Sequence, residues 1–597
     1  MTLIALRDPP LAAALALTGL ALFFGGGSGD GSLWWLGGAA ALAILVALAI
    51  RGVPRGFLML LPFAVLVAWL AASISWSWLP DRSWDYADRG LVYLLFAILG
   101  LWLAGRRREL ALGLCVLLGA LAAWALAAKV FPPLYDYGPP QPTRLRAPVG
   151  LWNQLALLGD IALPLALWRR RVSGTLLAYS WLVALVLTYS RGGLATAIVV
   201  VAVYLAFADD RLERGAVLVA AGLPAGVVAG VAFALPGVTS DGQSTSTRWS
   251  DGLIFGAALV VGAVAAVLLA RAPRPRDTPT LRRILIAAGA VALVAVVVLA
   301  VVKGGSFGNN TQVGNSSSRL GSSSSNFRTV WWHQAIDAWR LQKVEGIGAG
   351  SFALANRRFR DSYLDTTIEP HSLPLQFLSE TGIVGFVLFV LTVGFLLRGS
   401  RHRRGHELAL ALALPAYLLH SLIDVDWDFL AVSGPVFLIA GSLAGGLPVR
   451  RVSPFAVLAA AGAALLAVVV LVLPWLGERW ANDALGAAPA TAVRLADRAN
   501  SVDPLLVEPL WAKALAAEER GQPRRAFAFY VQAVNRQPKN PETWRAAGQY
   551  AFTLECWRSA YTYLERFTEL DNKAPPSAGA SAYRTALRHV NAGQNRC

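Results

Sequence analysis

Two arginines in this sequence stand at positions where a charged side chain is expected to serve a function. Arg191 lies between two apolar stretches and follows Tyr189-Ser190. A charge at the membrane edge is costly, which favours a functional role over an arginine that binds ordinary lipid headgroups. Arg328 begins a predicted helix, where a guanidinium and backbone N–H groups suit a phosphate. We expect both arginines to be catalytic.

His371 is the third catalytic candidate. It stands in Glu369-Pro370-His371-Ser372, shortly before an apolar stretch that begins near Leu375. An unperturbed imidazole titrates near pH ~6.5, so this side chain could take a proton from an acceptor hydroxyl. A histidine that only caps a helix or forms a hydrogen bond explains the pattern equally well on the sequence alone.

Other polar residues near the predicted outer ends of apolar stretches are expected to bind substrate: Asn153, Arg144, Arg146, Ser190, Glu380 and Asp424. Asn153 could instead be only a helix N-cap. Asp424, Asp426 and Asp428 alternate in one short turn, where carboxylates could bind a divalent ion or position arginines; we expect no metal. The glycine-rich segment Gly346–Phe352 lacks the Lys-Ser/Thr ending of a nucleotide-binding loop, and we expect no cofactor.

The elements that must position these residues are membrane-spanning helices. The chain of 597 residues is 56% hydrophobic and only 15% charged, whereas a soluble globular chain has about 25% charged residues. The apolar residues form about 15 blocks of roughly the length that crosses a bilayer. These blocks are residues 9–25, 33–50, 57–76, 89–105, 109–128, 153–168, 174–189, 191–207, 214–236, 252–270, 283–302, 375–397, 407–423, 430–447 and 454–475. The pattern predicts an all-α, polytopic transmembrane helical bundle.

The charge of the connecting loops predicts the orientation of this bundle. The net charge is +17, and arginine clusters such as Arg106–Arg108, Arg169–Arg171 and Arg401–Arg404 recur in every second loop. The positive-inside rule makes these loops cytoplasmic, rather than part of a nucleic-acid-binding surface. We therefore expect a multi-pass protein of the cytoplasmic (inner) membrane, with a cytoplasmic N-terminus and a periplasmic or extracellular C-terminal domain. Ser190 and His371 then lie outside, where a cytoplasmic nucleotide cannot reach them.

Four regions follow from this reading: N-terminal transmembrane helices (1–302), a large exported loop (303–374), C-terminal transmembrane helices (375–476) and an exported repeat domain (477–597). In the loop, Lys303–Asn326 is rich in Gly, Ser and Asn, and we expect it to be mobile. The apolar residues of Phe327–Trp339 recur at helical spacing. This spacing predicts an amphipathic helix at the membrane interface or a core helix within the loop.

The soluble tail shows an internal period, since Ala492, Ala526 and Ala560 are spaced by 34 residues. A helix–turn–helix unit of this length is typical of tetratricopeptide repeats. Such a domain could dock a protein partner, hold a glycan or peptide in its concave face, or act only as a structural cap. Cys556 and Cys597 both lie in this tail. An oxidising compartment would permit a disulfide between them, but the sequence leaves the pairing open.

These motifs, in this order, resemble the O-antigen ligase and O-antigen polymerase superfamily, which includes bacterial O-oligosaccharyltransferases. The resemblance covers roughly residues 1–447. It rests on Gly150-Leu151-Trp152-Asn153, Ser190-Arg191-Gly192-Gly193, Arg328 with Trp331, Gly346 through Phe352, His371, Glu380 through Gly385, and His420-Ser421-Leu422-Ile423-Asp424. Ser372 stands where the family usually has Asn, the span count exceeds that usual for the ligases, and the repeat tail is an addition.

The resemblance implies a GT-C-like, metal-independent, inverting glycosyltransferase. It would move a glycan from a polyprenyl diphosphate, such as undecaprenyl diphosphate, to a hydroxyl of a glycan, lipid or protein acceptor outside the cytoplasm. Arg191 and Arg328 would hold the diphosphate, and His371 would activate or orient the acceptor hydroxyl. The alternatives are a glycan polymerase or protein O-oligosaccharyltransferase of the same superfamily, a lipid-linked glycan transporter or flippase, and a non-catalytic membrane anchor for the repeat domain.

Overall fold

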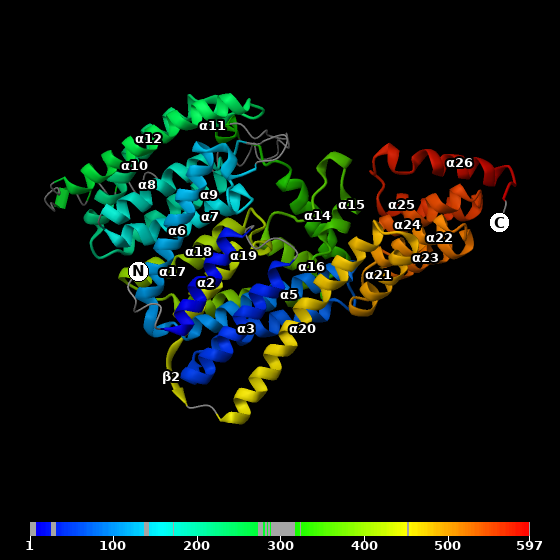
Figure 1. Ribbon diagram of the computed structural model, residues 1–597, viewed down its shortest axis with the longest axis horizontal. Helices are drawn as coiled ribbons and strands as arrows, with labels where there is room; N and C mark the ends of the chain where they lie inside the picture. Colours follow the sequence, from blue (N-terminus) through cyan, green and yellow to red (C-terminus); the bar gives the residue numbers. More distant parts are fainter. Residues whose placement is uncertain are drawn as a thin grey trace. The chain divides into compact units, whose positions relative to one another are not determined.

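Helices make up nearly all of the regular structure, which confirms the predicted all-α fold (Figure 1). The computed structural model describes residues 8–24, 31–136, 143–170, 172–272, 279–280, 283, 287, 317–322, 324–450, 453–595 and 597. Strands in this part of the chain are limited to β1 (Val53–Arg55) and β2 (Gly446–Arg450), which pair antiparallel.

The chain divides into two compact units: unit 1 is Met1–Pro62, Val92–Thr329 and Thr392–Ala464, and unit 2 is Phe63–Leu91, Val330–Leu391 and Leu465–Cys597.

Unit 1 holds most of the apolar helices, and α7, α8, α9, α10 and α12 pack against one another within it. Helices that lie in unit 1, or begin or end there, include α2 (Pro9–Phe23), α3 (Ser32–Arg51), α4 (Leu61–Ser73), α5 (Pro80–Leu101), α6 (Arg107–Val130), α7 (Trp152–Arg169), α8 (Val172–Leu187), α9 (Arg191–Phe207), α10 (Arg211–Phe233), α11 (Pro236–Thr239), α12 (Thr245–Arg271), α17 (Gly405–Ala411), α18 (Ala413–Ser421) and α19 (Leu430–Ala444). Short 3₁₀ helices connect some of them: η2 (Phe57–Leu60), η3 (Ala104–Arg106), η4 (Pro132–Leu134), η5 (Ser317–Gly321) and η7 (Asp426–Asp428).

The described helices are those of a multi-pass membrane protein. Six are long and apolar enough to cross a bilayer: Ser32–Arg51, Ala104–Val130, Arg211–Phe233, Thr245–Arg271, Leu373–Gly399 and Pro454–Leu485. Shorter apolar helices occupy five further predicted spans: Pro9–Phe23, Phe57–Ser73, Val172–Leu187, Arg191–Phe207 and Leu430–Ala444. The predicted span 407–423 is two helices, α17 and α18, because Pro415 has no N–H group to continue the helical hydrogen bonds. The predicted span 283–302 lies outside the described residues, apart from residues 283 and 287.

Loops that were predicted to be cytoplasmic contact one another within unit 1. Asp8 forms ion pairs with Arg51 and Arg106, at 2.7 and 3.0 Å. Arg107 pairs with Glu407 at 3.0 Å, and the β1–β2 pairing joins the loop after Arg51 to the loop before α20 (Pro454–Leu485), which belongs to the same set. These contacts thus bring together loops that the charge pattern assigns to the same side of the membrane. Which end of the bundle faces the cytoplasm stays a prediction.

Unit 2 contains most of α14 (Arg328–Leu341), the short helices α15 (Phe352–Phe359) and η6 (Tyr363–Asp365), and the first part of α16 (Leu373–Gly399). The predicted helix at Phe327–Trp339 is therefore confirmed as α14. Its buried residues are Trp331, Gln334, Ala335 and Ala338. Gln334 is polar but buried, and its amide oxygen accepts a hydrogen bond from Asn356 Nδ2 at 2.8 Å. This helix packs as a core helix of the loop. Most of the predicted mobile segment 303–326 lies outside the described residues.

The C-terminal tail of unit 2 is a row of helices, each packed against the next (orange to red in Figure 1). They are the end of α20 (Pro454–Leu485), α21 (Pro489–Val502), α22 (Glu508–Glu519), α23 (Pro523–Arg536), α24 (Pro541–Thr553), α25 (Trp557–Leu570), η8 (Pro576–Ala578) and α26 (Ala580–Asn591). The periodic residues Ala492, Ala526 and Ala560 are buried on alternate helices, at 3%, 0% and 0% exposure. The tetratricopeptide assignment itself stays a prediction.

Cys556 and Cys597 form a disulfide, with their Cα atoms 5.1 Å apart. This separation lies within the normal range for a disulfide. The bond joins the end of the chain to the residue that precedes α25, which resolves the pairing that the sequence left open.

Candidate functional site

Four arginines and one aspartate gather in one polar site of unit 1. Arg144 lies in the loop before α7, Arg191 begins α9, Arg319 lies in η5, and Arg328 begins α14. Burial first, and then the charges of the other three arginines, lower the pKa of Arg144 to about 8, whereas Asp424 acts in the opposite direction. The other four residues therefore all lie within electrostatic range of Arg144. This brings together three of the arginines and the aspartate that the sequence singled out.

Arg144 is held inside the loop that precedes α7. It is only 1% exposed, and its Nε donates a hydrogen bond to the Thr188 carbonyl at 2.9 Å. One Nη donates to Asn153 Oδ1 at 3.4 Å, and the guanidinium lies 4.0 Å from the centre of the Trp152 ring. Asn153 was considered as a helix N-cap, but α7 begins after Leu151 and Asn153 forms no cap. Arg146, on the same loop, is half-buried.

Ser190 and the two glycines after Arg191 fix the start of α9. Ser190 caps the helix, and its Oγ accepts a hydrogen bond from the Gly193 amide at 3.2 Å. A Cβ on Gly193 would lie 2.5 Å from Ala156 of α7, and a Cβ on Gly192 would lie 2.7 Å from Ile423. Only glycine permits this approach. The Arg191 guanidinium donates hydrogen bonds to the Ser322 carbonyl and, at 2.8 Å, to the Ser324 carbonyl.

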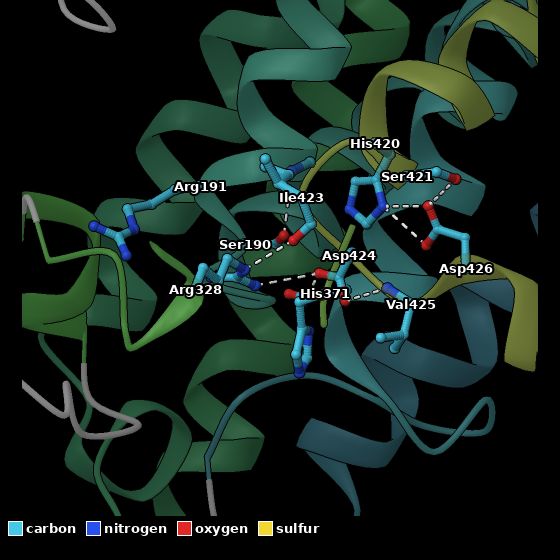
Figure 2. A network of polar contacts seen from close by, with 12 residues as sticks. Ser190, Arg191, Arg328, His371, His420, Ser421, Ile423, Asp424, Val425 and Asp426 are labelled. Carbon is cyan, nitrogen blue, oxygen red and sulfur yellow. Dashed lines mark hydrogen bonds and ion pairs between the residues drawn. The ribbon is translucent and has the colours of Figure 1, made fainter. Parts of the chain in front are cut away.

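Asp424 connects Arg328 to Asn153, and Figure 2 shows the contacts of its carboxylate with Arg328 and Val425. The Arg328 Nε donates to the Ile423 carbonyl at 2.8 Å, and its Nη2 donates to Asp424 Oδ2 at 3.4 Å. The same carboxylate accepts a hydrogen bond from Asn153 Nδ2 and, through Oδ1, from the Val425 amide at 3.0 Å. Asp424 is 2% exposed. Its carboxylate therefore orients one arginine of the site.

Arg319 is the member of this site that sequence analysis missed. It is 7% exposed, and burial together with the charges of Arg328 and Arg191 lowers its pKa to about 10. The sequence held one signal, because Arg319 is the only charged residue between Lys303 and Arg328. The serine-rich composition around it was taken as evidence for mobility instead.

His420 and Asp426 form a buried pair next to the arginine site, which the sequence indicated only through the family resemblance. His420 Nδ1 lies 2.9 and 3.0 Å from the two carboxylate oxygens of Asp426, and Ser421 Oγ donates to the same carboxylate at 2.8 Å (Figure 2). A Cβ on Gly192 would lie 4.0 Å from the His420 ring. The pair closes the turn that presents Ile423 and Asp424 to Arg328.

His371 belongs to unit 2, where aromatic residues hold it. Its backbone has φ 51°, a conformation that is uncommon outside glycine. The Trp331 ring stacks on the imidazole, with the ring centres 4.9 Å apart and the planes 25° apart. Trp332 Nε1 donates a hydrogen bond to the His371 carbonyl at 3.3 Å. Two consecutive residues of α14 thus fix the ring and the backbone of this histidine.

Glu369 anchors the segment just before His371. Its carboxylate accepts hydrogen bonds from the Tyr86 hydroxyl of α5 and from Gln376 Nε2 of α16. Gln376 also donates to Tyr86 at 3.0 Å, and Glu369 is 2% exposed. The three residues form a closed polar network, which the sequence did not predict because its members are far apart in the chain.

Glu380, a predicted substrate-binding residue, supports the glycine-rich turn in unit 2. Its Oε1 accepts a hydrogen bond from the Phe352 amide at 3.0 Å, at the start of α15. Its carbonyl accepts one from the Gly348 amide at 2.8 Å. A Cβ on Gly346 would lie 2.4 Å from the Glu380 backbone, so the glycines allow the turn to pack against α16. These contacts give Glu380 a structural role.

Residues 250–390 match the O-antigen ligase family model. The matched region contains Arg319, Arg328 and His371, and it ends before Asp424. The match supports the O-antigen ligase superfamily and, with the apolar helices, a membrane-bound glycan ligase or polymerase function. No curated protein matches the chain.

Proposed function

We propose that this protein transfers a glycan from a polyprenyl-diphosphate-linked donor to an acceptor hydroxyl. The reaction takes place at the outer side of the cytoplasmic membrane. In this orientation the N-terminus lies in the cytoplasm and the repeat domain is exported. The O-antigen ligase match at residues 250–390 supports this reaction class. The undecaprenyl carrier, the acceptor and the orientation are parts of the proposal.

The observation that carries the proposal is the arginine site of unit 1. The site holds four guanidinium groups and the carboxylate of Asp424, with which Arg328 forms an ion pair, so these five side chains carry a net charge of +3 when all are ionised. Guanidinium groups bind phosphate oxygens through paired, charge-assisted hydrogen bonds. A diphosphate is the donor group that such a site fits. Asn153 and Ser190 position Asp424 and the start of α9, and Arg146 extends the positive charge of the loop.

The proposed reaction is a direct displacement. The acceptor oxygen forms a bond to the anomeric carbon while the bond from that carbon to the diphosphate oxygen breaks. The leaving oxygen keeps the electron pair, and Arg191 and Arg328 stabilise its charge. His371 takes the proton of the acceptor hydroxyl. A single displacement inverts the anomeric centre, forms no covalent glycosyl-enzyme, and needs no metal because the arginines stabilise the leaving group.

The deciding experiment uses the purified full-length protein and a polyprenyl-diphosphate glycan, with lipid, glycan and protein acceptors tested separately. We expect one acceptor class to give an inverted product. Arg191→Ala, Arg328→Ala and His371→Ala should each lose most activity while the protein still accumulates in the membrane. The matched control is Arg340→Ala, because Arg340 lies on α14 with an exposed ion pair to Asp337.

Wild-type turnover in all three variants would overturn the assignment of the site. Chain extension of a glycan acceptor would identify a polymerase, and a glycosylated polypeptide would identify a protein O-oligosaccharyltransferase. Movement of the donor between leaflets of a vesicle, with no product formed, would replace the proposal by the flippase alternative.

A further inference from the structure

The C-terminal tail holds the segment that leads to His371. Arg360 ends α15, and Asp571 directly follows α25 in the tail. Arg360 Nη2 lies 2.7 Å from each carboxylate oxygen of Asp571, and its Nε lies 3.2 Å from Oδ1. The two side chains are only 5% and 4% exposed. A buried, multiply bonded ion pair of this kind fixes the geometry of both partners.

The same arginine passes this restraint to the next residues of the chain. Its Nη1 donates a hydrogen bond to the Thr366 hydroxyl. The Thr367 amide donates to Asn356 Oδ1 of α15 at 3.2 Å, and Asn356 Nδ2 donates to the Asp365 carbonyl at 3.1 Å. Residues 365–367 are therefore bonded to Asn356 of α15 and to Arg360, and Arg360 is bonded to the tail.

Two more contacts join the tail to the surroundings of His371. Arg357 of α15 pairs with Glu542 of α24 at 2.5 Å. Gln537 Nε2, at the end of α23, donates a hydrogen bond to Asp81 Oδ1 at 2.9 Å. Asp81 lies in the first turn of α5, the helix that also carries Tyr86, which bonds to Glu369. The tail thus reaches the His371 segment from two directions, through α15 and through α5.

We propose that the tail is an internal clamp: Asp571 holds Arg360 and thereby fixes segment 360–371, which presents His371 to the acceptor. The occupant of this face of the tail is the chain's own exported loop rather than a separate protein. Asp571 and Arg360 are positioning residues, since neither touches the substrate. The inference rests on the proposed function for its kinetic consequence, but its structural part does not depend on any substrate.

The test compares Asp571→Asn with wild type in hydrogen exchange and in kinetics. Breaking a buried pair leaves an uncompensated charge, so amide exchange in residues 360–371 should accelerate. A small displacement of a catalytic group can lower turnover by about a hundredfold, so kcat should fall while the Kd of the polyprenyl-diphosphate donor stays unchanged. The double variant Arg360→Met with Asp571→Leu removes both charges. It should partly restore the slow amide exchange of residues 360–371 and the kcat. The control, Glu569→Gln, alters an exposed ion pair of α25 and should match wild type.

The outcomes separate this inference from the proposed function. Wild-type exchange in Asp571→Asn would overturn the clamp, and so would faster exchange with an unchanged kcat. Because the exchange measurement needs no substrate, it tests the clamp even if no acceptor is glycosylated. A loss of donor affinity in Asp571→Asn would also refute the inference, because the clamp acts on His371 alone.

Discussion

Replacing Arg328 with lysine tests whether the arginine site works through geometry as well as charge. The Arg328 guanidinium donates Nε to the Ile423 carbonyl and Nη2 to Asp424. Among the described residues, these contacts use two of the five N–H groups of the guanidinium. The other three N–H groups can donate hydrogen bonds to a phosphate. Arginine can therefore be held by the protein and bind a phosphate at once. A lysine ammonium keeps the charge but lacks this fork.

The expected loss follows from the hydrogen bonds that lysine cannot keep. A hydrogen bond to a charged group contributes about 1.5–3 kcal/mol. Losing one such bond to the diphosphate lowers kcat/KM by roughly 10- to 150-fold, because each 1.36 kcal/mol changes a rate by a factor of about ten. Arg328→Ala removes the charge as well and should lose more activity than Arg328→Lys.

The assay measures kcat/KM for the polyprenyl-diphosphate donor at saturating acceptor. Arg340→Lys, on the exposed side of the same helix, is the matched control and should keep the wild-type value. If Arg328→Lys kept the full rate while Arg328→Ala lost it, a positive charge alone would suffice. The reasoning from the Ile423 and Asp424 contacts would then be wrong.

Three further variants test other parts of the structure. Arg319→Gln should weaken donor binding by about 1.5–3 kcal/mol, roughly tenfold or more in Kd, and an unchanged Kd in a binding titration would exclude this arginine from the site. Asp426→Asn should lower the apparent melting temperature in detergent, because the buried His420 loses its charged partner; a melting curve like that of wild type would contradict this. Burial and the charge of Glu508 raise the pKa of Asp81 from 3.8 to about 7. Between about pH 4 and pH 7 the folded state therefore binds more protons than the unfolded state, and the free energy of unfolding falls as the pH rises. Asp81→Asn should therefore raise the melting temperature more at pH 8 than at pH 5, and an equal effect at both values would refute the assigned pKa shift.

The helical membrane fold was accessible from the sequence because its signal is local. A continuous apolar stretch such as Ala104–Val130 predicts a span without any knowledge of its neighbours. The division of span 407–423 was not predicted, although Pro415 marked the position. A short break inside an apolar stretch does not alter the mean hydropathy that identifies a span, so composition alone overlooks it.

The candidate site was accessible only in part, because its members meet through contacts between distant loops. Arg191 and Arg328 stood out as charges beside apolar stretches. Arg319 did not, since its significance lies in burial among other arginines, which no local pattern encodes. The network of Tyr86, Glu369 and Gln376 likewise spans residues 290 positions apart in the chain. Sequence position gives no signal for such a network.

Anchoring to backbone carbonyls explains how three of these like charges can be assembled before any substrate binds. Arg144 donates to the Thr188 carbonyl, Arg328 to that of Ile423, and Arg191 to two carbonyls of the loop that precedes α14. These carbonyls belong to turns between helices, so the folding of the turns also sets the directions of the guanidinium groups. The negative charge of Asp424 offsets part of their repulsion. In the proposed reaction, a diphosphate that enters the site meets donors that are already oriented, so little reorganisation opposes the stabilisation of the leaving group.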